Sequence, residues 1–164
     1  MGADEEIESC VRAEYSRLVG VVAVVSGSRA SAEDAVQEAF AKAWERARRG
    51  QEFEHLAGWV VTVALNHARS GHRRRSSERK AIERLAARPV ADSASAVDDA
   101  AVVRSALSSL ARRQRDAVVL YYFLDLDVAT VANVLGISKG TVKSALARAR
   151  RKLAVVLGER ALEA

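Results

Sequence analysis

The chain has 164 residues, which is enough for one modest domain or two small ones, each with a core of a few packed helices. Hydrophobic residues make up 49% and charged residues 29%, a balance typical of a globular protein in water. The most apolar stretches, at 18–25 and 59–65, are too short to span a bilayer. The N-terminus is acidic where a secretory signal is basic, so we expect a cytoplasmic protein without membrane insertion.

The net charge of +5 is unevenly distributed along the chain. Residues 1–60 carry 7 basic and 11 acidic side chains, 61–90 carry 8 and 2, 91–130 carry 4 and 6, and 131–164 carry 7 and 2. Because a solvated surface usually mixes its signs, two separated basic blocks indicate two contacts with a polyanion. Plain solubility charge is the alternative explanation.

Three helices are predicted in the first half of the chain. Apolar residues recur at three- and four-residue intervals through 5–26, which predicts the first helix. Ser31 with Asp34 matches the S-x-x-D capping box, which places the start of the second helix there. A third helix is predicted to begin near Leu56 and to run into the basic stretch 72–75.

A stretch of small residues and serine surrounds Pro89, the one proline of the chain, and predicts a flexible linker at 86–98. Helical periodicity resumes beyond it, and no segment shows the alternation of a strand. The predicted fold class is therefore all-α, with two small helical domains at 1–85 and 99–164.

The strongest local signal is VATVANVLGISKGTVK at 128–143. Ala132 is small enough to let two helices cross closely, and Gly136 can take the positive φ of a tight turn. Val142 would fill the angle between the two helices. The spacing predicts a helix-turn-helix, with an ordinary helical hairpin as the alternative.

The second helix of this motif has the properties of a DNA recognition helix. Asp127 and Ser138 are suitable N-caps, one for each helix. The outer face of the second helix carries side chains suited to phosphates and base edges. These are Ser138, Lys139, Thr141, Lys143, Ser144, Arg148 and Arg151.

Two sets of segments resemble a known family. The first is AEDAVQEAFAKAW at 32–44, GWVVTVALN at 58–66 and RRR at 73–75, and it resembles the sigma-two domain of extracytoplasmic-function sigma factors of the sigma-70 family. The second, LSSLARRQRD at 107–116 with LGISKGTVKS at 135–144, is similar to their sigma-four domain. The resemblance covers about residues 7–157.

The resemblance implies a non-catalytic subunit without cofactor or metal, which binds core RNA polymerase and directs it to a promoter. It assigns binding of the clamp helices of the large polymerase subunit to Asp34, Gln37, Glu38 and Trp44. It assigns recognition and melting of the promoter −10 element to Asn66, Arg69, Arg73, Arg74 and Arg75, with the 51–56 loop. The recognition helix would read the −35 element. A separate anti-sigma factor is a further implied partner.

Several residues have a second interpretation or depart from the family pattern. Phe40 is expected in the core. For Trp44, a core role and a polymerase-binding role are equally expected. For Trp59, a core role is favoured over the stacking of bases. Ala111 stands where a proline is frequent, so the next helix would start less sharply. Ala145 stands where an arginine is frequent, which would remove a DNA contact.

Two other functions fit parts of the sequence. A free-standing helix-turn-helix regulator, binding an operator as a dimer, explains the C-terminal half but not the two different basic blocks. An enzyme acting on DNA lacks support, because the three histidines form no metal-ligand pattern and no Gly-rich phosphate loop occurs.

Overall fold

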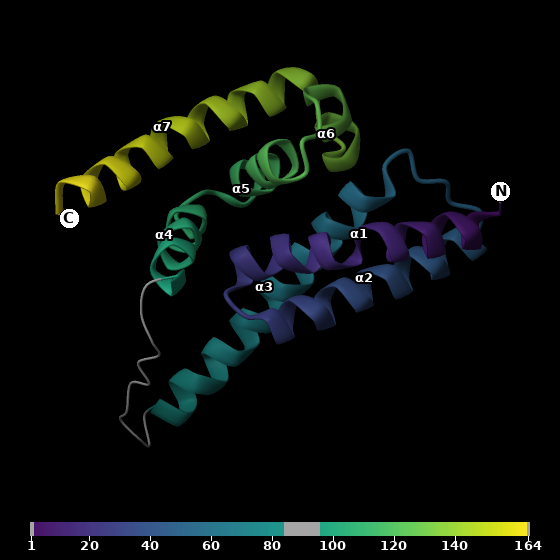
Figure 1. The fold of residues 1–164 in the computed structure, drawn as a ribbon, viewed down its shortest axis with the longest axis horizontal. Coiled ribbons are helices and arrows are strands. Elements are labelled where there is room, and N and C mark those ends of the chain that lie inside the picture. Colours follow the sequence, from purple (N-terminus) through teal and green to yellow (C-terminus); the bar gives the residue numbers. More distant parts are fainter. Residues whose placement is uncertain (1, 84–95, 164) are drawn as a thin grey trace.

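The computed structural model describes residues 2–83 and 96–163, and every regular element in these ranges is helical. In chain order they are α1 (Ala3–Ser26), α2 (Arg29–Arg48), α3 (Leu56–Glu83), α4 (Ala96–Ser108), α5 (Arg112–Val118), the π-helix η1 (Val119–Phe123), α6 (Val128–Leu135) and α7 (Lys139–Glu163) (Figure 1). The predicted all-α fold class is confirmed. Within the described ranges, none of the helices combines the length and apolarity needed to cross a membrane.

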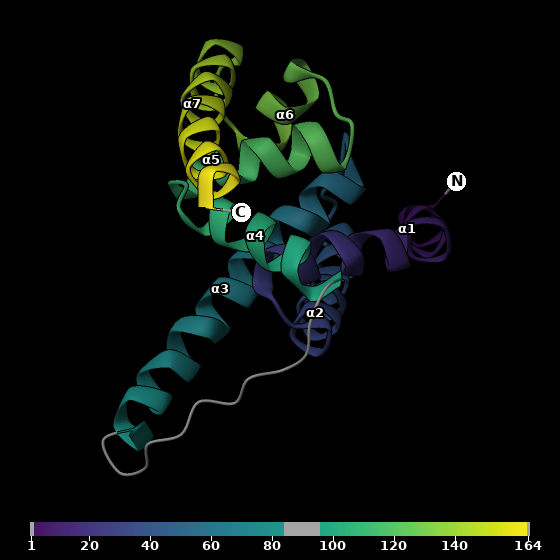
Figure 2. The ribbon, with the colours of Figure 1, turned by 60° about the vertical axis from the view of Figure 1, so that its left-hand side comes forward.

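The first half is a three-helix bundle of α1, α2 and α3 (Figures 1 and 2). Each helix contributes an apolar stripe, and Leu18, Val36 and Val60 are completely buried between them. Burying one such side chain contributes about 1.5–3 kcal/mol, so the bundle rests mainly on this shared core. The start of α3 at Leu56 agrees with the sequence prediction.

The start of α2 differs from the prediction. Its N-cap is Ser28, whose extended backbone (φ −144°, ψ 121°) lets the side-chain oxygen accept from the backbone N–H of Ser31 at 3.2 Å. Ser31 therefore lies inside the first turn, and the predicted capping box at Ser31 and Asp34 is wrong. Two serines three residues apart can each serve as a cap, and the break at Gly27 selects the earlier one.

In the second half, α7 packs against α5 and α6, and α4 contacts both α7 and α1 (Figure 2). Helix α5 continues directly into η1, and the turn after η1 holds Asp125 at a positive φ of 53°. A short polar side chain tolerates this left-handed conformation better than most residues. The turn returns the chain toward the core, where Leu124 and Leu126 are buried.

The predicted linker is described only at its end. Pro89 lies outside the described residues, and α4 begins at Ala96, within the range assigned to the linker from the sequence. The domain limits of 1–85 and 99–164 therefore stay a prediction.

Candidate nucleic-acid interface

The helix-turn-helix is formed by α6, the turn at Gly136 and the first turns of α7. Gly136 takes the predicted left-handed conformation at φ 64°, and the N–H of Ile137 closes the end of α6 by donating to the Ala132 carbonyl at 3.0 Å. Val142 is completely buried and Ala132 is 5% exposed. Each residue of the predicted motif therefore occupies the structural position expected for it.

Both predicted N-caps are formed. The Asp127 carboxylate accepts from the Thr130 N–H at 2.7 Å, and the Ser138 hydroxyl accepts from the Thr141 N–H at 3.1 Å. The backbone hydrogen bond from Thr130 is the main reason why the pKa of Asp127 is lowered from its ordinary 3.8, with the side chain of Thr130 and the charge of Lys139 assisting. The ionised carboxylate is therefore the form that stabilises the start of α6.

The cap predicts how the stability of the motif depends on pH. Because the folded state lowers the pKa of Asp127, its contribution is present above the ordinary 3.8 and is lost as the pH falls through the lowered value. We expect wild type to be more stable than Asp127→Asn at neutral pH, and the difference to shrink below pH 3.8. Thermal unfolding followed by circular dichroism between pH 7 and 2.5 measures this difference, and a constant gap would contradict it.

The recognition helix α7 has one buried and one exposed face. Val142, Leu146 and Ala149 are at most 1% exposed and hold the helix against the rest of the domain. Every side chain predicted to contact the −35 element is exposed: Ser138, Lys139, Thr141, Lys143, Ser144, Arg148 and Arg151. The exposed face therefore combines cations for phosphates with hydroxyls and guanidinium groups for base edges.

The two departures from the family pattern have structural explanations. Ala145 is 7% exposed and lies on the buried face of α7. The expectation that an alanine here removes a DNA contact stays a prediction. Ala111 precedes α5 with φ −60°, and its N–H donates to the Gln114 side chain at 3.4 Å. This φ is the value that proline also imposes, but a proline here would lack the N–H that donates to Gln114.

The residues predicted to bind polymerase lie on α2. Asp34, Gln37 and Glu38 are exposed, whereas Trp44 is half-buried against the core. Glu38 pairs with Lys42 at 3.4 Å along the helix, an exposed pair that contributes little to stability. Phe40 is 3% exposed and is a core residue, as expected. The surface of α2 therefore presents carboxylates that a cationic partner can reach.

The residues predicted to bind the −10 element lie on α3. Asn66 is half-buried, and its Oδ1 atom is buried without a hydrogen-bond partner. The side chains of Arg69, Arg73, Arg74 and Arg75 lie outside the described part of the structure, although their backbone belongs to α3. The structure thus places the predicted residues on one helix without testing their contacts.

A cleft of about 710 Å³ lies beside the start of α3. One wall holds Phe53 and Trp59, whose ring centroids lie 4.9 Å apart, and the Arg46 guanidinium lies 5.3 Å from the Trp59 centroid. The opposite wall comes from α6 and the turn, including Asn133 and Ser138. Trp59 is half-buried: it packs against the core, as expected, and it also lines this cleft. Phe53 lies in the 51–56 loop that the resemblance assigned to the −10 element, but it was not singled out, because no periodicity distinguishes one aromatic residue in a loop.

The geometry defines a class of protein: an all-helical chain with a helix-turn-helix DNA-binding unit in one half and, in the other, a three-helix bundle with exposed carboxylates on α2. Two family models match these parts. Sigma-70 region 2 matches residues 10–78, and Sigma-70 region 4 matches residues 100–153.

Individual proteins similar to this chain belong to the same family as the two matching models. An ECF RNA polymerase sigma factor, SigM of Mycobacterium tuberculosis, is 32% identical over 148 residues, covering 90% of this chain and 74% of the relative. The RNA polymerase sigma-E factor of Streptomyces coelicolor is 30% identical over 164 residues, covering 100% of this chain and 93% of the relative. The solved structure of the sigma factor RpoE in complex with the anti-sigma factor NepR from Bartonella quintana matches with a TM-score of 0.68 and 25% identity over 94% of this chain and 98% of that one.

The chain therefore belongs to the sigma-70 family of RNA polymerase sigma factors, in its extracytoplasmic-function group. It functions as an RNA polymerase sigma factor, and a free-standing operator-binding regulator is not favoured. Proteins of this family are in general not enzymes.

Proposed function

We propose that this chain binds core polymerase through the exposed carboxylates of α2 and carries two separate promoter-reading surfaces. The observation that carries the proposal is the division of α7 into a buried apolar face and an exposed cationic face. A surface of this kind supplies sequence-independent attraction to phosphates and side chains for the −35 element. The basic segment of α3, with Asn66, would serve the −10 element.

The cleft aromatics extend this assignment. Phe53 and Trp59 form a tilted pair, and base–aromatic stacking holds unpaired bases without reading their sequence. We assign to them the stacking of bases from the opened strand, because promoter melting must stabilise bases that have left the duplex. Phe53 thus joins the residues predicted from the sequence.

We further propose that a separate anti-sigma factor inhibits the chain, because the similar RpoE structure is a complex with such a factor. The assignment places the protein in the cytoplasm, where polymerase acts, and gives it no catalytic residue, cofactor or metal. Its contribution to initiation is binding energy directed at polymerase and promoter.

Reconstituted run-off transcription tests the proposed function. Purified chain added to core polymerase is expected to give transcripts from a defined set of promoter fragments, and each start should require the added chain. Absence of transcripts together with tight binding of a palindromic duplex by the chain alone would favour the regulator instead.

Charge reversal tests the polymerase surface. Asp34→Lys or Glu38→Lys is expected to weaken binding to core polymerase about fivefold to tenfold, because each places a cation where a cationic partner surface approaches. Both side chains are exposed, so folding should be unaffected. Glu8→Lys on α1 is the control, since Glu8 is exposed and pairs with Arg12 at 3.8 Å. Equal affinities for all the variants would remove α2 from the interface.

A further inference from the structure

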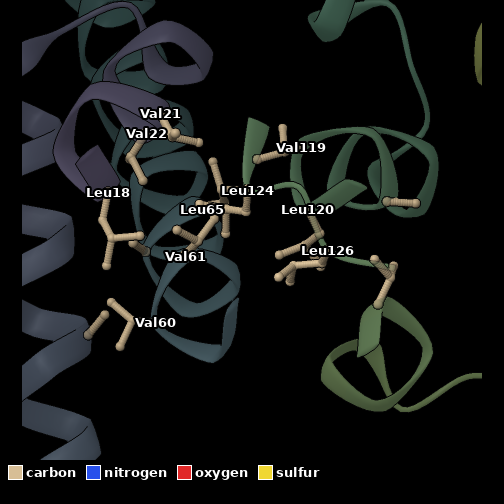
Figure 3. Packing of buried hydrophobic residues seen from close by; sticks show 14 of the residues in the cluster. Leu18, Val21, Val22, Val60, Val61, Leu65, Val119, Leu120, Leu124 and Leu126 are labelled. Atoms are coloured by element: carbon tan, nitrogen blue, oxygen red, sulfur yellow. The ribbon is translucent and has the colours of Figure 1, made fainter. Parts of the chain in front are cut away.

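Another cavity, of about 410 Å³, lies where four helices meet. Its walls come from α1, α3, α4 and α5. The apolar part of the lining consists of Val25, Leu65, Ala68 and Ala101. Leu65 also belongs to the buried apolar cluster shown in Figure 3, so the cavity adjoins that cluster. A cavity of this size, with an apolar lining and a few polar groups, has the properties of a small-molecule site.

Several polar side chains around this cavity already donate to the protein itself. The hydroxyls of Ser26 and Ser108 donate to backbone carbonyls at 3.2 and 2.8 Å. The Arg115 guanidinium donates to the Asp116 carboxylate from two nitrogens, at 3.2 and 2.9 Å. This carboxylate neutralises Arg115 as well as accepting its hydrogen bonds. A ligand would therefore find few free donors in these three side chains.

Arg104 is in a different situation. Its side chain lines the cavity, and its Nε atom is buried without a hydrogen-bond partner among the residues that the structure describes. Arg104 packs against Gly27, since a Cβ added to Gly27 would lie 2.8 Å from Nε and 2.9 Å from Cδ. The missing side chain of Gly27 thus makes room for the arginine. A buried polar group without a partner needs an explanation, and an absent ligand is one.

The end of α1 offers Arg104 a partial counter-charge. Gly27 is the C-cap of α1, and the last turn of this helix contains no basic residue. A helix C-terminus carries roughly half a negative elementary charge, so it balances only part of the guanidinium charge. Because the pair of Arg115 and Asp116 is neutral, a partial positive charge remains beside the cavity. This charge favours a monoanion, such as a carboxylate, over a dianion.

We propose that this cavity binds a small carboxylate that carries an apolar tail. The tail lies against the four apolar lining residues, and the carboxylate accepts hydrogen bonds from the Arg104 guanidinium. Arginine binds carboxylates through charge-assisted hydrogen bonds, which are stronger than bonds between neutral groups. The site shares no residue with the cleft at Phe53 and includes no residue of α7, so it goes beyond the proposed function.

Three probes test the two parts of the proposed ligand on the full chain. Octanoate has both the carboxylate and the tail, acetate lacks the tail, and octanol lacks the charge. Isothermal titration calorimetry at neutral pH measures their affinities. We expect about one octanoate to bind to each chain, and both acetate and octanol to bind at least about tenfold more weakly, because each loses one of the two contacts.

Two variants locate the binding site. Arg104→Met removes the charge and keeps an unbranched side chain, so it should weaken octanoate binding about tenfold to a hundredfold. Arg113→Met makes the same exchange at an exposed position of α5 outside the cavity, and should leave the affinity unchanged. Ala101→Leu fills the space of the tail and should remove most of the binding. Circular dichroism checks the fold of each variant, and Ala68→Leu on α3 replaces Ala101→Leu if the latter does not fold.

Each alternative result has a separate meaning. Octanol bound as tightly as octanoate, or an unchanged affinity of Arg104→Met, would overturn the role of the carboxylate. Acetate bound as tightly as octanoate would overturn the role of the tail. Octanoate binding that survives filling of the cavity, or no octanoate binding at all, would overturn the site. These measurements need neither polymerase nor DNA, so their result does not depend on the proposed function.

Discussion

Replacing Asp116 with alanine is expected to lower the free energy of unfolding by about 3–5 kcal/mol, the largest effect of any exchange proposed for this chain. Asp116 is 3% exposed, and its Oδ1 accepts from Nε and Nη2 of Arg115 at 3.2 and 2.9 Å. Arg115 is itself only 9% exposed, so removal of the carboxylate leaves a cation inside the domain with little access to water. Thermal unfolding should show a midpoint lower by about 10 °C.

Two further variants separate loss of the pair from loss of packing. Arg115→Met with Asp116→Leu removes both charges and keeps most of the volume, so it should recover most of the lost stability. Arg113→Ala, at an exposed position of the same helix, should change the unfolding free energy by less than about 0.5 kcal/mol. If Asp116→Ala were as stable as Arg113→Ala, the buried pair would not stabilise the domain.

Replacing Lys143 or Arg148 with alanine is expected to weaken −35-dependent promoter binding by about 1–3 kcal/mol for each side chain that reads a base edge. Both side chains are exposed on α7, whose opposite face holds the helix in place, so neither change should unfold the domain. The polymerase complex is titrated with promoter duplexes that carry an intact or a scrambled −35 element. For a side chain that reads a base edge, the loss of affinity should appear with the duplex that carries the intact −35 element and not with the scrambled one.

The same titration distinguishes base reading from phosphate contact. A side chain that touches phosphate should weaken binding to both duplexes equally and reduce the salt slope by about one. Lys152→Ala is the control on the same helix, one turn beyond Arg148 and also exposed. Equal affinities of wild type and variants for both duplexes, at every salt concentration, would remove these residues from the −35 surface.

Local sequence patterns were sufficient for much of the helix-turn-helix. The caps at Asp127 and Ser138, the turn at Gly136 and the buried Val142 are each decided by residues within four or five positions. A local pattern predicts a helix start less well when two nearby residues can each serve as the cap. In α2 the cap is Ser28 and not Ser31. The burial of Ala145 was not predicted, because the sequence analysis considered the arginine that the family often has there and not the face of the helix on which position 145 lies.

The sequence by itself determined the class of fold, the recognition helix with its exposed cations, and the family to which the chain belongs. Periodicity and capping are short-range properties, so they can be recognised without knowing what packs against them. The tertiary structure alone decided that Phe53 and Trp59 share a cleft with the recognition-helix cap, and that Arg17 reaches Phe123 and Asp125. Such contacts join residues up to about a hundred positions apart, and their partners are selected by shape and charge in three dimensions, which no local pattern records.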